Sequence, residues 1–138
     1  MANTLESEKE IKRKEYNIIR YSNSSSIHEG IKSNVNISFE ILSRKYHIDN
    51  KFIGIYWPLK GEIDIRFLRN SNHEKFALPS SSKINGLNYH FWSNKKLEPD
   101  ENNIPSPLNE KALKPIDISM LLVPAIAIDQ EGYRLGYG

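Results

Sequence analysis

Near the C-terminus, glycines surround an arginine in a pattern that suits anion binding. The segment Gly132-Tyr-Arg-Leu-Gly-Tyr-Gly138 follows an apolar run that ends at Pro124. Glycines at 136 and 138 allow backbone N–H groups to approach a phosphate closely, and Arg134 can offer its guanidinium fork to phosphate oxygens. The same spacing is typical of a simple turn, so phosphate binding and a turn both stay open.

Other chemistry-bearing residues are sparse. The chain has no cysteine, which excludes disulfides, thiolate catalysis, iron–sulfur clusters and cysteine zinc sites. The histidines His28, His47, His73 and His90 are isolated in the sequence and form no ligand pattern. We expect them to be surface or capping residues, and any metal to arrive with a nucleotide.

Two helices are expected before residue 50. Apolar residues fall on one helical stripe over about residues 26–46, namely Ile31, Val35, Phe39, Leu42 and Tyr46. A first helix over about Glu6 to Tyr21 has a thin apolar stripe, so we expect its long basic side chains to contribute to docking.

Short strands are expected after residue 50. Runs rich in β-branched and aromatic residues predict strands at 52–57, 76–79, 87–92 and 120–124. A short helix over Ile63 to Arg69 separates the first two runs, and this order favours parallel pairing with a right-handed crossover. Residues 93–115 show no clear period and read as a surface excursion. The pattern predicts an α/β domain with a mainly parallel sheet.

The composition limits the class of protein. A chain of 138 residues with 38% hydrophobic and 26% charged residues suits one globular domain. The N-terminus lacks a secretory signal and no apolar run could cross a bilayer, so we expect a cytoplasmic location and no membrane partner. Basic residues are interspersed with acids and lack clustered aromatic residues, which disfavours RNA and other nucleic acids. We expect a monomer.

Over a longer stretch, the sequence pattern resembles that of the 5-formyltetrahydrofolate cyclo-ligase family, also called methenyltetrahydrofolate synthetase. The strand ending in Leu-Val-Pro124, the Ala-x-Asp at 127–129 and the Gly-x-Arg-Leu-Gly-x-Gly loop carry the resemblance. Three further segments agree in order: 56–64 with its Gly-Glu-x-Asp turn, Phe76-Ala-Leu-Pro79, and Ile104-Pro-Ser-Pro107. The resemblance spans residues 8–138 and implies a three-layer α/β/α fold.

The resemblance also implies a reaction. Members of the family close a ring in 5-formyltetrahydrofolate to give 5,10-methenyltetrahydrofolate, with conversion of ATP to ADP and phosphate. Such chemistry needs positioning groups, cations on the phosphates and Mg²⁺, and little covalent participation by the protein. The implied partners are therefore 5-formyltetrahydrofolate and ATP, and the implied cofactor is Mg²⁺.

Carried over by the resemblance, Glu62 is the carboxylate that binds the folate, and Trp57 lines the same pocket. By its local sequence alone, Glu62 could instead be an acid in the first turn of a helix, and Trp57 a core residue. On the first helix, Lys9 and Arg13 match the family's phosphate-binding cations. A shift of one position would select Lys12 in place of Arg13, and a solvated helix face is the simpler alternative.

The C-terminal loop supplies the remaining implied site. Arg134 is expected to be catalytic and to bind ATP together with Leu135, Gly136, Tyr137 and Gly138, of which Tyr137 and Gly138 also face the folate. Two departures from the family pattern matter. Ser106 replaces a glutamate, and the family's loop continues with an aspartate that ligates magnesium. We therefore expect residues 1–138 to form one incomplete domain, truncated at the C-terminus, with no metal ligand. The alternative function is an inactive fragment that binds nucleotide or folate without turnover.

Overall fold

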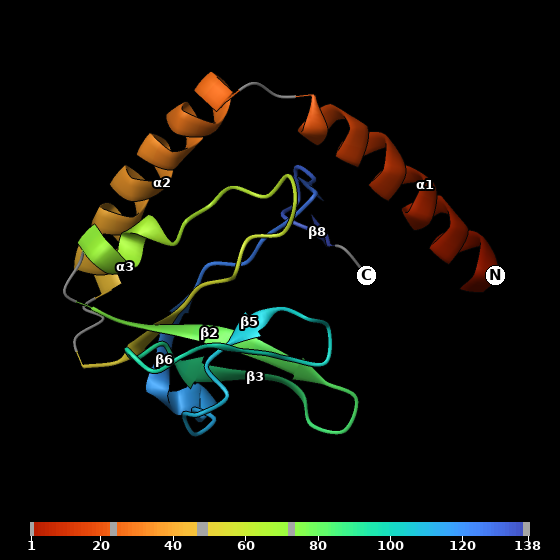
Figure 1. Cartoon of the computed structure of the whole chain (residues 1–138). Helices are drawn as coiled ribbons and strands as arrows, with labels where there is room; N and C mark the ends of the chain where they lie inside the picture. Colours follow the sequence, from red (N-terminus) through yellow and green to blue (C-terminus); the bar gives the residue numbers. More distant parts are fainter. Residues whose placement is uncertain (1, 23–24, 47–49, 72–73, 137–138) are drawn as a thin grey trace.

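The computed structural model describes residues 2–22, 25–46, 50–71 and 74–136 of the chain. Two helices form the start of the chain, and the part after them consists mainly of strands (Figure 1). The helices are α1 (Ala2–Tyr21), α2 (Ser25–Tyr46), α3 (Phe67–Ser71) and the 3₁₀ turn η1 (Pro115–Asp117). The strands are β1 (Phe52–Gly54), β2 (Lys75–Ser82), β3 (Gly86–Phe91), β4 (Glu98–Pro99), β5 (Pro105–Ser106), β6 (Ile118–Leu121), β7 (Ala127–Ile128) and β8 (Arg134–Leu135).

The main sheet has the strand order β3-β2-β1-β6. Strand β1 pairs in parallel with β2 and with β6, whereas β2 and β3 form an antiparallel hairpin. The helix α3 lies in the connection from β1 to β2, as parallel pairing requires. The predicted α/β class with a mainly parallel sheet is confirmed. The predicted helix at 63–69 begins later, at Phe67.

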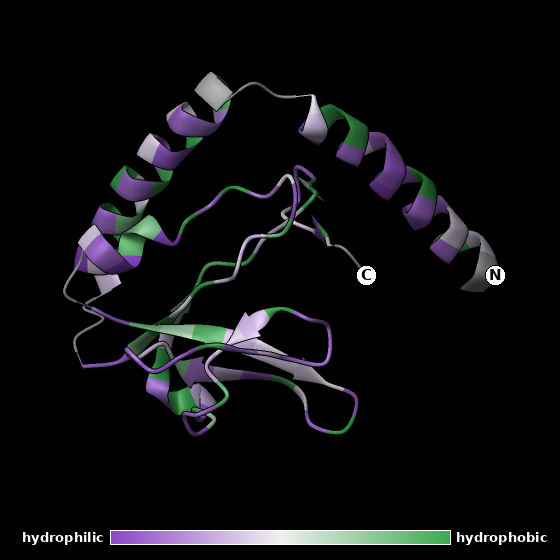
Figure 2. Ribbon diagram, viewed as in Figure 1, coloured by the Kyte–Doolittle hydropathy of each residue, from purple (hydrophilic) through white to green (hydrophobic). Residues whose placement is uncertain are grey.

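The core lies between α2, α3 and the sheet. Phe39 of α2 is 2% exposed, and its ring centroid lies 5.9 Å from that of Phe76 on β2. Leu68 of α3 is fully buried in the same cluster, together with Ile53 and Leu78 of the sheet. The predicted stripe of α2 is therefore used mainly through its centre, since the residues nearer its ends, Ile31, Leu42 and Tyr46, stay exposed. Figure 2 shows hydrophobic and hydrophilic residues interspersed along α2.

Helix α1 docks through basic side chains, as its thin apolar stripe predicted. Arg13 Nε donates to the Gly136 carbonyl at 3.0 Å, and Arg20 donates to the Ala125 carbonyl. Ile11 and Ile18 of α1 are more than half exposed. In Figure 1, α1 lies beside the C-terminal segment that contains β8, away from the main sheet. Among the described helices, none has the length and apolar character needed to cross a membrane.

The segment 93–115 is more ordered than the sequence predicted. The Asp100 carboxylate accepts hydrogen bonds from the backbone of Ser81, Asn102 and Ile104, which fastens the β4–β5 hairpin to β2. Ser106 is fully buried and donates to the Pro79 carbonyl at 2.9 Å. Most of the segment lies at the surface, as predicted, and only Ser106 and Pro107 are buried. The sequence did not indicate the hairpin or its attachment by the Asp100 carboxylate.

His90 also differs from its prediction. Its side chain is 9% exposed, with Nε2 at 2.8 Å from Ser80 Oγ and Nδ1 at 2.8 Å from the Glu110 carbonyl. Because a carbonyl can only accept, Nδ1 carries a proton and donates to the Glu110 carbonyl. His90 is therefore a buried structural link between β2, β3 and the following segment, and not a surface residue. His47 and His73 lie outside the described residues.

Candidate functional site

The glycine and arginine segment forms a small hairpin. Strands β7 and β8 pair in antiparallel register, and Ile126 N–H donates to the Leu135 carbonyl at 2.8 Å. Asp129 closes the turn, since its Oδ1 accepts from Glu131 N–H at 2.9 Å and Tyr133 N–H at 2.8 Å. A turn, one of the two alternatives that the sequence allowed for this segment, is thus present. It places Arg134 on the strand β8.

Loss of the Asp129 acceptor should loosen this hairpin. In Asp129→Ala, we expect the amide hydrogen of Ile126 to exchange about tenfold faster, because two hydrogen bonds worth roughly 0.5–1.5 kcal/mol each are removed. Hydrogen exchange followed by NMR measures this. Asp129→Asn keeps an acceptor oxygen and should exchange almost as slowly as the wild type, whereas equal acceleration in both variants would contradict the role of Oδ1.

A groove of about 540 Å³ separates this hairpin from α1. Basic side chains reach it from both walls: Lys9 and Lys12 from α1, and Arg134 from β8. Apolar side chains, including Ile11, Ile128 and Leu135, form much of the remaining lining. We call this space the α1 groove. The structure thus brings together two of the predicted ATP-binding cations, Lys9 and Arg134, although they lie at opposite ends of the chain.

Arg134 and Gly136 are close neighbours in the hairpin. Arg134 Nη1 donates to the Pro124 carbonyl at 3.0 Å, and it would lie 2.9 Å from a Cβ built on Gly136. A larger residue at 136 would therefore displace the guanidinium. Leu135 is half-buried, and its carbonyl is bonded to Ile126 N–H. The predicted site residues Tyr137 and Gly138 lie outside the described residues.

The two possible alignments of α1 with the family pattern select either Arg13 or Lys12 as the second phosphate-binding cation. Lys12 lines the α1 groove and forms an ion pair of 2.9 Å with Glu15, which raises the pKa of Lys12 and keeps its ammonium charged. Arg13 is not among the lining residues, and its side chain is only 16% exposed because it is bonded to Gly136 and Glu6. The structure therefore favours Lys12, the alternative register, as the second groove cation.

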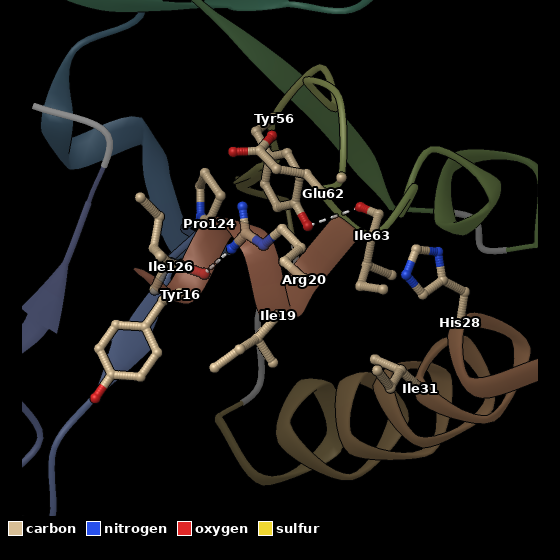
Figure 3. A pocket seen from close by; sticks show the side chains of 12 residues that line it. Tyr16, Ile19, Arg20, His28, Ile31, Tyr56, Glu62, Ile63, Pro124 and Ile126 are labelled. Atoms are coloured by element: carbon tan, nitrogen blue, oxygen red, sulfur yellow. Dashed lines mark hydrogen bonds between the residues drawn. The ribbon is translucent and has the colours of Figure 1, made fainter. Parts of the chain in front are cut away.

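A second cavity, of about 250 Å³, holds Glu62 (Figure 3). We call it the Glu62 cavity. Its walls come from α1, α2, the 56–63 segment and the 124–126 segment, and its polar side chains are Tyr16, Arg20, His28, Tyr56 and Glu62. Tyr56 Oη donates to the Ile63 carbonyl at 2.8 Å. Burial and the nearby Glu62 charge raise the pKa of Tyr56 to about 12, so the phenol stays protonated.

Glu62 is held by a tight turn. Its Oε2 accepts from Leu59 N–H at 2.8 Å, and Glu62 N–H donates back to the Leu59 carbonyl at 3.0 Å. Gly61 has a φ of +81°, and a Cβ there would lie 2.3 Å from the Tyr21 ring. The alternative reading of Glu62 as a first-turn helix acid was wrong, because α3 begins only at Phe67. The turn engages Oε2, so Oε1 is the oxygen that a ligand would meet.

Trp57 lies apart from the Glu62 cavity. Its ring packs edge-on against Trp92, with centroids 6.2 Å apart, and the Arg66 guanidinium lies 4.3 Å from its centroid. Arg66 also pairs with Asp64 at 2.7 Å and lowers the pKa of that carboxyl. Trp57 is not among the residues that line the Glu62 cavity, and it packs against the core cluster.

The two spaces adjoin, since Tyr16 of α1 lines both of them. Residues Lys9, Lys12, Tyr16 and Arg20 recur on α1 at spacings of three, four and four, so they share one helix face. The sequence indicated Lys9 and, as an alternative, Lys12 as binding residues. Tyr16 and Arg20 were not predicted, although the same helical spacing includes them. His28 and Tyr56 had no comparable signal. Among the described residues, no group of three or more His, Asp or Glu could hold a metal.

Comparison with known proteins gives structural matches. No family model and no curated protein sequence matches the chain. The NMR structure of Aquifex aeolicus 5,10-methenyltetrahydrofolate synthetase matches with a TM-score of 0.77 and 27% identity, over 94% of this chain and 67% of that chain. A 5,10-methenyltetrahydrofolate synthetase from Mycoplasma pneumoniae matches with a TM-score of 0.69 and 20% identity, over 94% of this chain and 71% of that chain, and supports the fold alone.

The α/β fold of the chain is similar to that of a methenyltetrahydrofolate synthetase, a folate cyclo-ligase. The resemblance seen in the sequence is confirmed by the Aquifex aeolicus structure, which shares the fold of this chain over nearly its whole length.

Proposed function

We propose that the chain catalyses ATP-dependent ring closure of 5-formyltetrahydrofolate to 5,10-methenyltetrahydrofolate, with release of ADP and phosphate. The observation that carries this proposal is the pair of adjoining spaces that meet at Tyr16. One space presents cations from two walls, which suits a polyphosphate, and the other presents a carboxylate, which suits the N–H groups of a pterin. A reaction between two such substrates needs both sites side by side.

In the proposed reaction, the formyl oxygen on N5 attacks the γ-phosphorus of ATP and ADP leaves. N10 then attacks the activated formyl carbon, its proton is lost, and the formyl oxygen departs as part of phosphate. The protein's residues bind and orient the substrates and offset phosphate charge. Lys9, Lys12 and Arg134 are the proposed phosphate cations, and Glu62 is the proposed pterin acceptor.

Two of the earlier site predictions are kept as part of this proposal. The loop of Leu135, Gly136, Tyr137 and Gly138 is assigned to ATP, and Tyr137 and Gly138 also to the folate. The Trp57 contact with folate stays a prediction, supported only by the family resemblance, and so does the cytoplasmic location.

Mg²⁺ would supply charge neutralisation on the phosphates when bound with ATP. Magnesium is usually held by one or two carboxylates and by substrate phosphates, with several waters retained. Glu8 and Asp129 are the carboxylates that line the α1 groove within the described part of the chain, and Asp129 Oδ1 is already used in the hairpin turn. These residues fit a metal that enters as the ATP complex, and they would contact it through their remaining oxygens or through water.

The direct test is to mix the chain with ATP, Mg²⁺ and 5-formyltetrahydrofolate and to follow the absorbance of methenyltetrahydrofolate. We expect turnover that requires ATP. Calorimetric titration with each substrate alone separates the alternative function, because binding without product would identify a non-catalytic binder. Absence of both binding and turnover would reject the proposal.

The contribution of Lys9 should be modest and salt-dependent. Lys9 is about half exposed and lies 3.9 Å from Glu6, so its ammonium is partly solvated. We expect Lys9→Ala to weaken ATP binding about two- to fivefold at low salt, and less at physiological ionic strength, where the Debye length is about 8 Å. Lys14→Ala on the same helix removes an equal charge outside the groove and is the control. Equal effects of both variants would show that Lys9 acts only through net charge.

A further inference from the structure

Tyr16 has a position that no other described residue shares, because it lines both the Glu62 cavity and the α1 groove. Both spaces have walls from α1 and from one continuous stretch of chain. Residues 124–126 of that stretch line the Glu62 cavity, and residues 127–129 line the α1 groove. The two spaces are therefore consecutive along α1, and Tyr16 stands at their boundary.

The side chain of Tyr16 presents a different part to each space. Figure 3 shows its ring directed away from Tyr56 and Glu62, with the hydroxyl at the far end. The Lys12 ammonium, which lines the α1 groove, lies 5.9 Å from the centroid of the same ring. Tyr16 is 36% exposed, so ligands can reach it. Its hydroxyl thus points out of the Glu62 cavity, toward the groove that Tyr16 also lines.

The proposed reaction requires the two substrates to meet at one point. The formyl oxygen of the folate must reach the γ-phosphorus of ATP, and reacting atoms in a productive complex stand about 3–3.5 Å apart. With ATP in the α1 groove and the folate in the Glu62 cavity, this contact has to form at the boundary, beside Tyr16. A phenol hydroxyl is a hydrogen-bond donor, and the oxygens of a transferring phosphoryl group are strong acceptors.

We propose that Tyr16 is a catalytic residue that contacts both substrates and donates a hydrogen bond to the phosphoryl group as it passes from ATP to the formyl oxygen. This inference rests on the proposed function and adds to it a residue that was not predicted from the sequence. The bond from the γ-phosphorus to the ADP oxygen breaks as the bond to the formyl oxygen forms. No proton leaves the phenol, so Tyr16 is unchanged by the step.

The first arm of the test needs no turnover. NMR follows the tyrosine rings of the wild-type chain during separate titrations with 5-formyltetrahydrofolate and with a non-hydrolysable ATP analogue plus Mg²⁺. We expect the Tyr16 ring resonances to shift with both ligands. Tyr56 should shift with the folate alone and Tyr133 with the nucleotide alone, since each lines one space. Tyr46, which is exposed on α2 and lines neither space, should not respond.

The pattern of shifts separates the inference from the proposed function. A response of Tyr16 to one ligand only, or no response of Tyr16 while Tyr56 and Tyr133 respond, would overturn the shared contact and leave the proposed function standing. If no ring responded to either ligand, the proposed function would fail, and the inference would fail with it.

The second arm removes the hydroxyl and keeps the ring. We expect Tyr16→Phe to lower kcat about ten- to a hundredfold, the order found for one donor to a charged transition state. The dissociation constants of ATP and the folate, measured by calorimetry, should change less than about twofold, because the lost interaction belongs to the transition state. Tyr46→Phe is the matched control. A lysine also lies over its ring, with Lys45 Nζ 5.3 Å from the centroid, and it should keep wild-type turnover.

An unchanged kcat in Tyr16→Phe would overturn the catalytic role, and so would an equal loss in Tyr46→Phe. A weaker affinity for ATP at unchanged kcat would make Tyr16 a contact of the bound nucleotide only. Binding of both substrates by the wild-type chain without turnover would reject the proposed catalysis, and the role of Tyr16 in it.

Discussion

Replacing Arg134 by alanine should weaken ATP binding by about ten- to a hundredfold, since a hydrogen bond to a charged group contributes roughly 1.5–3 kcal/mol. Arg134 is exposed at the surface of the α1 groove and is the cation of its hairpin wall. Its guanidinium can meet a phosphate with two parallel donors, whereas the opposite wall offers only ammonium groups. The loss should therefore exceed that of any single groove lysine.

Isothermal titration with ATP and Mg²⁺ measures the effect. Arg134→Lys keeps the charge without the fork and should fall between wild type and Arg134→Ala. Lys83→Ala, which removes one exposed charge outside both spaces, is the matched control. Binding of 5-formyltetrahydrofolate should change little in Arg134→Ala. If folate binding were lost while ATP binding stayed normal, the nucleotide would have to occupy another part of the molecule.

The sheet could be predicted because its strands carry strong local signals. The runs at 52–57 and 76–79 are apolar enough to predict two strands, and the short helix expected between them predicted their parallel pairing. The hairpin β4–β5 could not be predicted in the same way. Its strands are only two residues long, so they show no periodic pattern in the sequence. The hairpin is held against β2 by the Asp100 carboxylate, a contact that the local sequence does not indicate.

The site was only partly predictable for a related reason. Glycine spacing around Arg134 and the charge of Lys9 are local features, so the sequence indicated both. Whether Lys12 or Arg13 faces the groove depends on where Gly136 lies, and that contact spans 123 residues. Trp57 shows the same limit, because its stacking with Trp92 and Arg66 depends on packing that the local sequence around residue 57 does not indicate.

Helix α1 connects these observations. With one face it lines both spaces through Lys9, Lys12, Tyr16 and Arg20, and with Arg13 it holds the hairpin. Its apolar residues are largely exposed, so polar contacts to backbone carbonyls carry most of its docking. Substitutions in α1 should therefore affect ligand binding more than they affect unfolding of the sheet.

Glu62→Gln should weaken binding of 5-formyltetrahydrofolate by about ten- to a hundredfold, because a carboxylate that accepts two pterin N–H donors would be replaced by a neutral amide. The melting temperature should change little. The glutamine oxygen can still accept from Leu59 N–H, so the turn that carries residue 62 is preserved. Titration with the folate and thermal unfolding of both proteins measure the two effects.

Glu101→Gln is a closely matched control, since the Glu101 carboxylate also accepts a backbone N–H at 2.8 Å, from Lys83, and lies outside the Glu62 cavity. It should leave folate binding unchanged. A large fall in melting temperature with intact folate affinity would make Glu62 a purely structural turn residue. If Glu62→Gln instead weakened ATP binding and left folate binding intact, the assignment of the two substrates would be reversed. ATP would then bind in the Glu62 cavity and the folate in the α1 groove.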